Sequence, residues 1–207
     1  MSALLQLSRL IDRLSEWVGR WLSWLVLIMV LISATNASVR KALSFSSNSF
    51  LEIQWYLFAA VFLLASGYTL LRQEHVKIDV VLGRFSRPTQ IKVEIFGLVA
   101  FLMPFVFAVI AEVMPLVIKA YYSGEMSENA GGLVRWPVYA LVPIGFALLG
   151  IQGLSEIIKR VAFLKGLIDD PGKKQQAKTA EEELAEVIRA RAEAEAAAAM
   201  ATGGKAK

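Results

Sequence analysis

The chain has 207 residues, of which 56% are hydrophobic, and its mean hydropathy of +0.53 exceeds that of ordinary soluble domains. The absence of cysteine excludes disulfides, thiolate metal sites and cysteine nucleophiles, and the single histidine excludes a haem held by two histidines of this chain. The net charge of +4 comes from basic residues beside apolar segments, which does not indicate a nucleic-acid-binding patch.

Residues 1–20 are predicted to form an amphipathic helix that lies at the membrane interface. Apolar side chains recur at spacings of three and four on one face, and charged side chains occupy the opposite face. The apolar positions are Leu4, Leu7, Ile11, Leu14 and Val18, and the charged positions are Arg9, Arg13, Glu16 and Arg20. The alternative is a direct extension of the first membrane span.

Four apolar stretches follow, at about 21–39, 53–71, 94–118 and 136–157. A bilayer core of about 30 Å needs about 20 apolar residues as helix, and in lipid a helix satisfies its own backbone hydrogen bonds. The sequence therefore predicts an all-α integral membrane protein whose four-helix transmembrane domain covers residues 21–165. A signal peptide is the alternative for the first stretch, whose apolar core is longer than is typical of signal peptides.

Lysine and arginine predict the orientation of these spans. Thirteen of them lie before the first span, between the second and third, and in residues 159–174 after the fourth, against four in the other two loops. Basic loops stay on the cytoplasmic side. Both termini are therefore predicted to be cytoplasmic.

The last segment, 166–207, is predicted to be a charged, alanine-rich cytoplasmic tail. Pro171 and Gly172 break the chain, and Thr179 with Glu182 forms a capping box for a solvated helix. Such a helix either serves as a dispensable tail or docks on a partner.

The sequence contains no phosphate-binding glycine loop, zinc-protease motif or nucleophile elbow, so we predict no catalytic, cofactor-binding or metal-binding residues in it. Glu112, in the outer part of the third span, has two interpretations. It is either a functional carboxylate for ion coupling, or a group satisfied by water, by Lys119 or by a partner helix.

Four short motifs follow one another along the spans and carry a family resemblance. They are E-x-Q-W-Y-L-F from Glu52 to Phe58, G-Y-T-L then H-V-K-I-D-V from Gly67 to Val80, S-x-N-x-G-G-L-x-R-W-P from Ser127 to Pro137, and P-I-G-F-A-L-L-x-x-Q from Pro143 to Gln152. In order and spacing, residues 10–165 resemble the small, DctQ-like, four-span membrane subunit of tripartite ATP-independent periplasmic (TRAP) transporters.

The resemblance implies a multi-pass protein of the bacterial inner membrane that is not an enzyme. In such systems a periplasmic binding protein captures the substrate, usually an organic acid anion, and a large multi-span subunit carries the substrate and sodium sites. The small subunit pairs with the large one and buttresses it, and has no cofactor of its own. The alternatives are the small four-span subunit of a tripartite tricarboxylate transporter, or a stand-alone small membrane transporter or enzyme.

Candidate functional residues are therefore partner contacts. Those predicted on the periplasmic side are Glu52, Gln54, Trp55, Ser127, Glu128, Asn129, Arg135 and Trp136. In the cytoplasmic loop, Asp79 is expected to cap a short interfacial helix, and His75 to face headgroups or the partner subunit.

Overall fold

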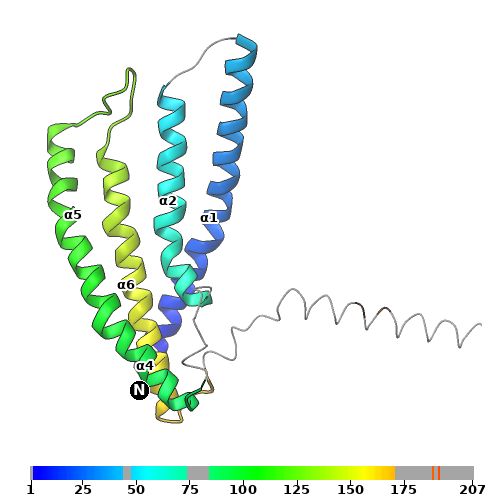
Figure 1. Ribbon diagram of the computed structural model, residues 1–207, viewed down its shortest axis with the longest axis vertical. Coiled ribbons are helices and arrows are strands. Elements are labelled where there is room, and N and C mark those ends of the chain that lie inside the picture. The colour runs from blue at the N-terminus through cyan, green and yellow to red at the C-terminus, as the bar shows by residue number, and fades with distance from the viewer. Residues whose placement is uncertain (1, 44–47, 74–83, 171–187, 189–190, 192–207) are drawn as a thin grey trace, which may run out of the picture. The chain divides into compact units, whose positions relative to one another are not determined.

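The computed structural model describes residues 2–43, 48–73 and 84–170, together with Ile188 and Arg191. In these ranges the chain forms helices α1 (Ser2–Leu43), α2 (Asn48–Arg72), α4 (Arg87–Gly97), α5 (Met103–Ser123) and α6 (Trp136–Leu164) (Figure 1). A five-residue π-helical turn, η1 (Leu98–Leu102), joins α4 to α5. The described part of the chain has no strand beyond one isolated bridge, so the all-α prediction is confirmed.

The chain divides into two compact units, Met1–Asp169 and Asp170–Lys207. The first unit holds the helices above. Of the predicted tail, Ile188 and Arg191 are helical. The predictions for its capping box, for His75 and for Asp79 lie outside the described residues.

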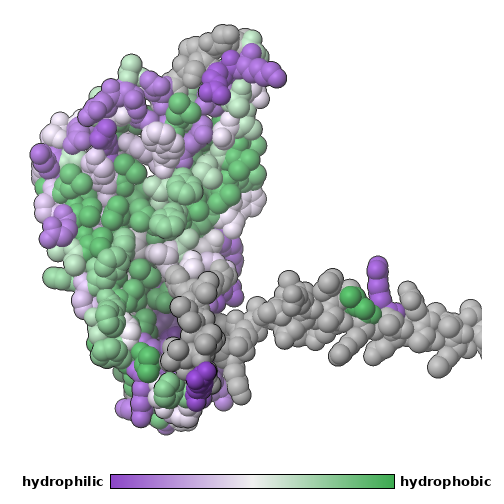
Figure 2. All heavy atoms as spheres, viewed as in Figure 1, coloured by the Kyte–Doolittle hydropathy of each residue, from purple (hydrophilic) through white to green (hydrophobic). Residues whose placement is uncertain are grey.

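Four helical segments of the first unit are long and apolar enough to cross a membrane. They are α1, α2, the continuous run α4–η1–α5, and α6, and each contains one of the predicted spans. In Figure 2 hydrophobic side chains form a band across the middle of the bundle, with polar side chains gathered towards both ends. Apolar surface of this kind is typical of a bundle surrounded by lipid.

Successive spans run in opposite directions, so the bundle has two distinct ends (Figure 1). We call the end that holds residues 124–135 the hairpin end, and the end that holds the start of α1 and the end of α6 the N-terminal end. The end of α1 and the start of α2 are also at the hairpin end. This arrangement puts basic residues from three predicted flanks at the N-terminal end, among them Arg9, Arg72 and Lys159.

Helix α1 has 42 residues and continues without a break through residue 20. At 1.5 Å per residue it is about 60 Å long, about twice the thickness of a bilayer core. Residues 2–20 and the first predicted span therefore form one helix, and the position of residues 2–20 relative to the membrane stays a prediction.

The face of residues 2–20 that packs against α6 is polar. Ser8 and Ser15 are buried, whereas Leu4, Leu7 and Leu14 are exposed. The exposed leucines belong to the apolar face that the sequence predicted to lie at the membrane interface. Here the opposing surface of α6 is itself polar, and it binds the serines.

Helix α6 is the central helix of the unit, because it packs against α1, α2 and α5. Small residues permit these contacts. A Cβ atom at Gly145 would lie 2.6 Å from the carbonyl oxygen of Leu63 in α2. Ser66 joins the same two backbones, since its hydroxyl lies 2.7 Å from the Leu63 oxygen and 3.3 Å from the Gly145 oxygen. A side chain at position 145 would therefore separate α2 from α6.

The third span begins and bends at prolines. Ser86 is the N-cap of α4 with extended dihedral angles, and Pro88 follows in the first turn. The π turn η1 ends just before Pro104, in the first turn of α5. Proline has no N–H to donate and its ring crowds the carbonyl four residues earlier, so the wider turn relieves both problems.

Candidate functional site

The segment between α5 and α6 is a hairpin loop, residues 124–135, which carries several predicted contact residues. Gly124, with a φ of 62°, ends α5 in the left-handed conformation that favours glycine. Backbone hydrogen bonds then close the hairpin: Ser127 N–H donates to Leu133 O at 2.9 Å, and Arg135 N–H donates to Glu125 O at 2.9 Å. The loop thus has a defined conformation that can present side chains to a partner.

Glu52 in α2 holds this hairpin. The residue is only 4% exposed, and one carboxylate oxygen accepts the Leu133 N–H at 2.6 Å. The other oxygen accepts from the Asn129 amide at 2.8 Å and from the Ser127 hydroxyl. Buried carboxylates are stable only when hydrogen bonds replace their hydration, and these three donors do so. Three predicted contact residues, Glu52, Ser127 and Asn129, therefore bind one another.

Three more side chains of α2, which the sequence interpretation missed, bind the same hairpin. The Asn48 amide donates to Ala130 O at 3.1 Å, the Tyr56 hydroxyl donates to Val134 O at 3.0 Å, and the Ser49 hydroxyl donates to Gly131 O. The sequence spacing could have indicated that these side chains act together, because residues 48, 52 and 56 lie four apart on one face of a helix.

The other predicted residues at this end differ in accessibility. Trp55 is 67% exposed, and Glu128 is exposed at the tip of the hairpin. Both are available to a partner. Gln54 instead faces α1, where its side-chain oxygen accepts from Ser33 at 3.1 Å. Its amide nitrogen is buried with no hydrogen-bond partner among the described residues.

Arg135 and Trp136 mark the start of α6. The Arg135 guanidinium lies 3.8 Å from the Glu125 carboxylate and donates to the Tyr139 hydroxyl at 3.4 Å. This hydrogen bond to Tyr139 raises the pKa of Arg135, which therefore remains charged. The Trp136 ring packs edge-on against Tyr121, with 5.3 Å between ring centroids. Both residues are partly exposed, so partner contact stays a prediction for them.

A second polar cluster lies at the N-terminal end, where α1, α4 and α6 meet. We call it the α1–α6 polar network, and its members are Ser8, Asp12, Ser15, Glu94, Gln152, Ser155, Glu156, Lys159 and Arg160. Most of its members are buried. No single motif of the sequence pointed to this network.

Asp12 connects α1 to α6 within this network. Its carboxylate accepts from Ser155 at 2.7 Å, from Gln152 at 2.9 Å and from Lys159 at 3.1 Å. The Ser155 hydroxyl has one proton, so when it donates to Asp12 the Ser8 hydroxyl, 2.8 Å away, is the donor to Ser155. Since each polar group has a partner, the serine face of α1 is fixed against α6 in one register.

Glu156 and Arg160 form the most buried ion pair in the described part of the chain, with side chains 1% and 5% exposed. Glu156 also pairs with Lys159. Arg160 extends the network to α4, where its Nε lies 2.7 Å from the Glu94 carboxylate. Three carboxylates and two cations thus pair with one another at the point where three helices meet.

Neither cluster has the composition of a metal centre. Within the described residues, no group of three or more His, Cys, Asp or Glu side chains is placed to hold a metal ion. Glu112 is exposed on α5, and both interpretations of it stay predictions. The α1–α6 polar network joins helices to one another, and the contacts of Glu52 fix the hairpin loop on α2.

The comparisons with known proteins agree with this architecture. The model of the DctQ component of tripartite ATP-independent periplasmic transporters matches residues 29–163. A search of the curated proteins found no match, and neither did a search of the solved structures. The matched region contains the hairpin, its Glu52 anchor and the α6 side of the polar network. The chain therefore belongs to the DctQ component family of the tripartite ATP-independent periplasmic transporters.

Proposed function

We propose that this chain is the non-catalytic small permease subunit of a sodium-coupled, binding-protein-dependent secondary transporter that imports an organic acid anion. In this proposal it pairs with a large multi-span subunit and buttresses it, while a periplasmic protein delivers the substrate. Family membership is the observation that carries the proposal. The family also favours this system over a tripartite tricarboxylate transporter.

The way the chain uses its polar side chains supports a scaffold role. Glu52, Asp12, Glu156 and Arg160 all contact other parts of the same chain. A transport path needs polar groups that face a cavity near the middle of the membrane, and here the compensated charges bind helix to helix. We therefore assign the substrate and sodium sites to the large subunit and no cofactor to this chain.

The proposed location is the bacterial inner membrane, with both termini in the cytoplasm. The bias of lysine and arginine towards the N-terminal end supports this orientation. The proposed orientation puts the hairpin and Glu128 in the periplasm, where a binding protein docks. Asp79 would then lie in the cytoplasmic loop.

Co-purification tests the pairing. When the tagged chain is co-expressed with the large TRAP subunit from the same genome, we expect a heterocomplex that remains intact through size-exclusion chromatography. The large subunit of a tripartite tricarboxylate transporter is the matched control, and we expect it to be absent from the eluate. Retention of both large subunits, or of neither, would contradict the pairing.

A further inference from the structure

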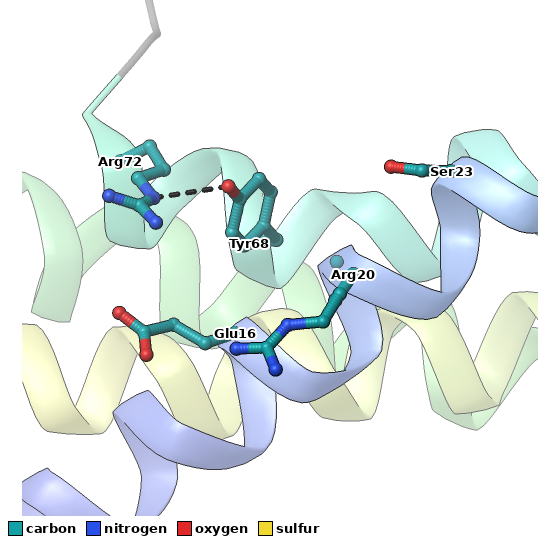
Figure 3. Close-up of a pocket in the computed structure, with 6 residues that line it drawn as sticks. Glu16, Arg20, Ser23, Tyr68 and Arg72 are labelled. Carbon is teal, nitrogen blue, oxygen red and sulfur yellow. Dashed lines mark hydrogen bonds between the residues drawn. The ribbon is translucent and has the colours of Figure 1, made fainter.

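A crevice of about 280 Å³ lies between α1 and α2 near the N-terminal end of the bundle. Its lining consists of Glu16, Gly19, Arg20, Ser23, Tyr68 and Arg72. Figure 3 shows Glu16, Arg20 and Ser23 projecting from α1 and Tyr68 and Arg72 from α2. This site is separate from the α1–α6 polar network, because none of its residues belongs to that network.

The close contact between Gly19 of α1 and Tyr68 of α2 forms one wall of this crevice. A Cβ atom at Gly19 would lie 2.5 Å from the Tyr68 ring, so only glycine lets the tyrosine lie against α1. The Tyr68 hydroxyl then accepts from Arg72 Nε at 3.1 Å, and the guanidinium lies 5.3 Å from the ring centroid. These contacts position Arg72, and among the described residues the only hydrogen bond of its side chain is made through Nε, so that the two terminal nitrogens can bind a ligand.

The charges in the crevice favour a singly charged anion. Two guanidinium groups and one carboxylate line it, which leaves an excess of one positive charge. No ion pair joins Arg20 or Arg72 to any of the residues that the structure describes. Arginine prefers oxyanions that accept two parallel hydrogen bonds, and a phosphodiester meets this requirement with a single negative charge.

The position of the crevice points to a lipid as the source of the phosphate. Arg20 lies among Trp17, Trp21 and Trp24, which are all exposed. Exposed tryptophans of a membrane helix lie at the level of the lipid headgroups. The guanidinium groups are therefore at the depth where phospholipid phosphates are found, and basic sites between membrane helices bind such headgroups.

We propose that the α1–α2 crevice binds the phosphate of an anionic phospholipid in the leaflet at the N-terminal end. Arg20 and Arg72 hold the phosphate, and Ser23 and Tyr68 line the rest of the headgroup site. The bound lipid joins α1 to α2 beside the polar network. The proposal needs only a membrane around the bundle, and it is independent of the transported substrate.

Native mass spectrometry of the full-length chain in non-ionic detergent tests the proposal. The probes are phosphatidylglycerol, phosphatidylcholine with the same acyl chains, and inorganic phosphate. We expect phosphatidylglycerol adducts to exceed phosphatidylcholine adducts, and the double variant Arg20→Gln, Arg72→Gln to reduce the former about tenfold. The matched control is Arg9→Gln, Arg13→Gln, which removes two exposed arginines of α1 outside the crevice and is expected to bind lipid normally.

Three results would overturn the proposal. Equal retention of the two lipids by the unaltered chain would show that there is no anionic site, and this result does not depend on any variant folding. An equal loss of phosphatidylglycerol in the control pair would show that binding reflects net charge alone. Displacement of the lipid by millimolar inorganic phosphate would assign the crevice to free phosphate instead. Circular dichroism and size-exclusion profiles are compared first, to establish that both double variants fold.

Discussion

Replacing Glu156 by alanine is expected to destabilise the helical bundle by about 3 kcal/mol, at the lower end of the cost of breaking a buried ion pair. The side chain is 1% exposed and pairs with both Lys159 and Arg160. Its removal leaves these cations in a buried environment with fewer counter-charges. The cost stays at the low end because Asp12 still holds Lys159 and Glu94 still holds Arg160.

Unfolding in mixed detergent micelles, followed by circular dichroism, measures this effect. The matched control is Glu112→Ala, which removes an exposed glutamate from α5 and is expected to change the free energy of unfolding by no more than about 0.5 kcal/mol. Glu156→Gln retains hydrogen bonding but not the charge, so the free energy of unfolding of this variant is expected to lie between those of Glu156→Ala and Glu112→Ala. Equal stability of Glu156→Ala and Glu112→Ala would show that the network does not hold the helices together.

Replacing Glu52 by alanine is expected to free the hairpin of residues 124–135 from α2. The change leaves the Leu133 N–H, the Asn129 amide and the Ser127 hydroxyl without their shared acceptor. We expect hydrogen exchange in this segment to accelerate on the order of tenfold, because local opening no longer breaks those bonds. Hydrogen-exchange mass spectrometry of the hairpin peptide gives the rate.

Glu128→Ala is the control for this experiment, since it removes an exposed glutamate from the same loop with the same change in charge. Its exchange rate is expected to match that of the unaltered chain. If the hairpin exchanges equally fast in Glu52→Ala and in the unaltered chain, Glu52 is not what positions it. Because the proposed binding-protein contact is on this hairpin, Glu52→Ala should also weaken docking of that protein.

The sequence predicted the helices well because lipid imposes strong constraints on them. Long apolar stretches and their charged flanks locate the spans. The motif around Glu52 and the motif around Ser127 pointed to the same end of the bundle. The sequence therefore predicted that these segments lie at one end of the bundle, and it did not predict the hydrogen bonds between them.

The packing of α1 was not predictable in the same way. Ser8, Asp12 and Ser15 have the spacing of one helical face, but one sequence does not show that Gln152 and Ser155 lie opposite them. Periodicity identified the apolar face of this segment, and not the contacts that Ser8, Asp12 and Ser15 make with α6. The charged residues at the end of α6, Glu156, Lys159 and Arg160, likewise resembled an ordinary charged flank of a membrane span. Their ion pairs with other helices could not be predicted, because one sequence does not show which helices are neighbours.

Uptake by reconstituted vesicles tests the central claim, that this chain is a scaffold subunit of the transporter and carries no transport path itself. The assay compares vesicles that contain this chain, the large TRAP subunit, or both, each with the binding protein, labelled organic acid anions and a sodium gradient. The account predicts sodium-dependent uptake only when both membrane chains are present. Uptake by this chain alone, or full uptake by the large subunit without it, would contradict the account.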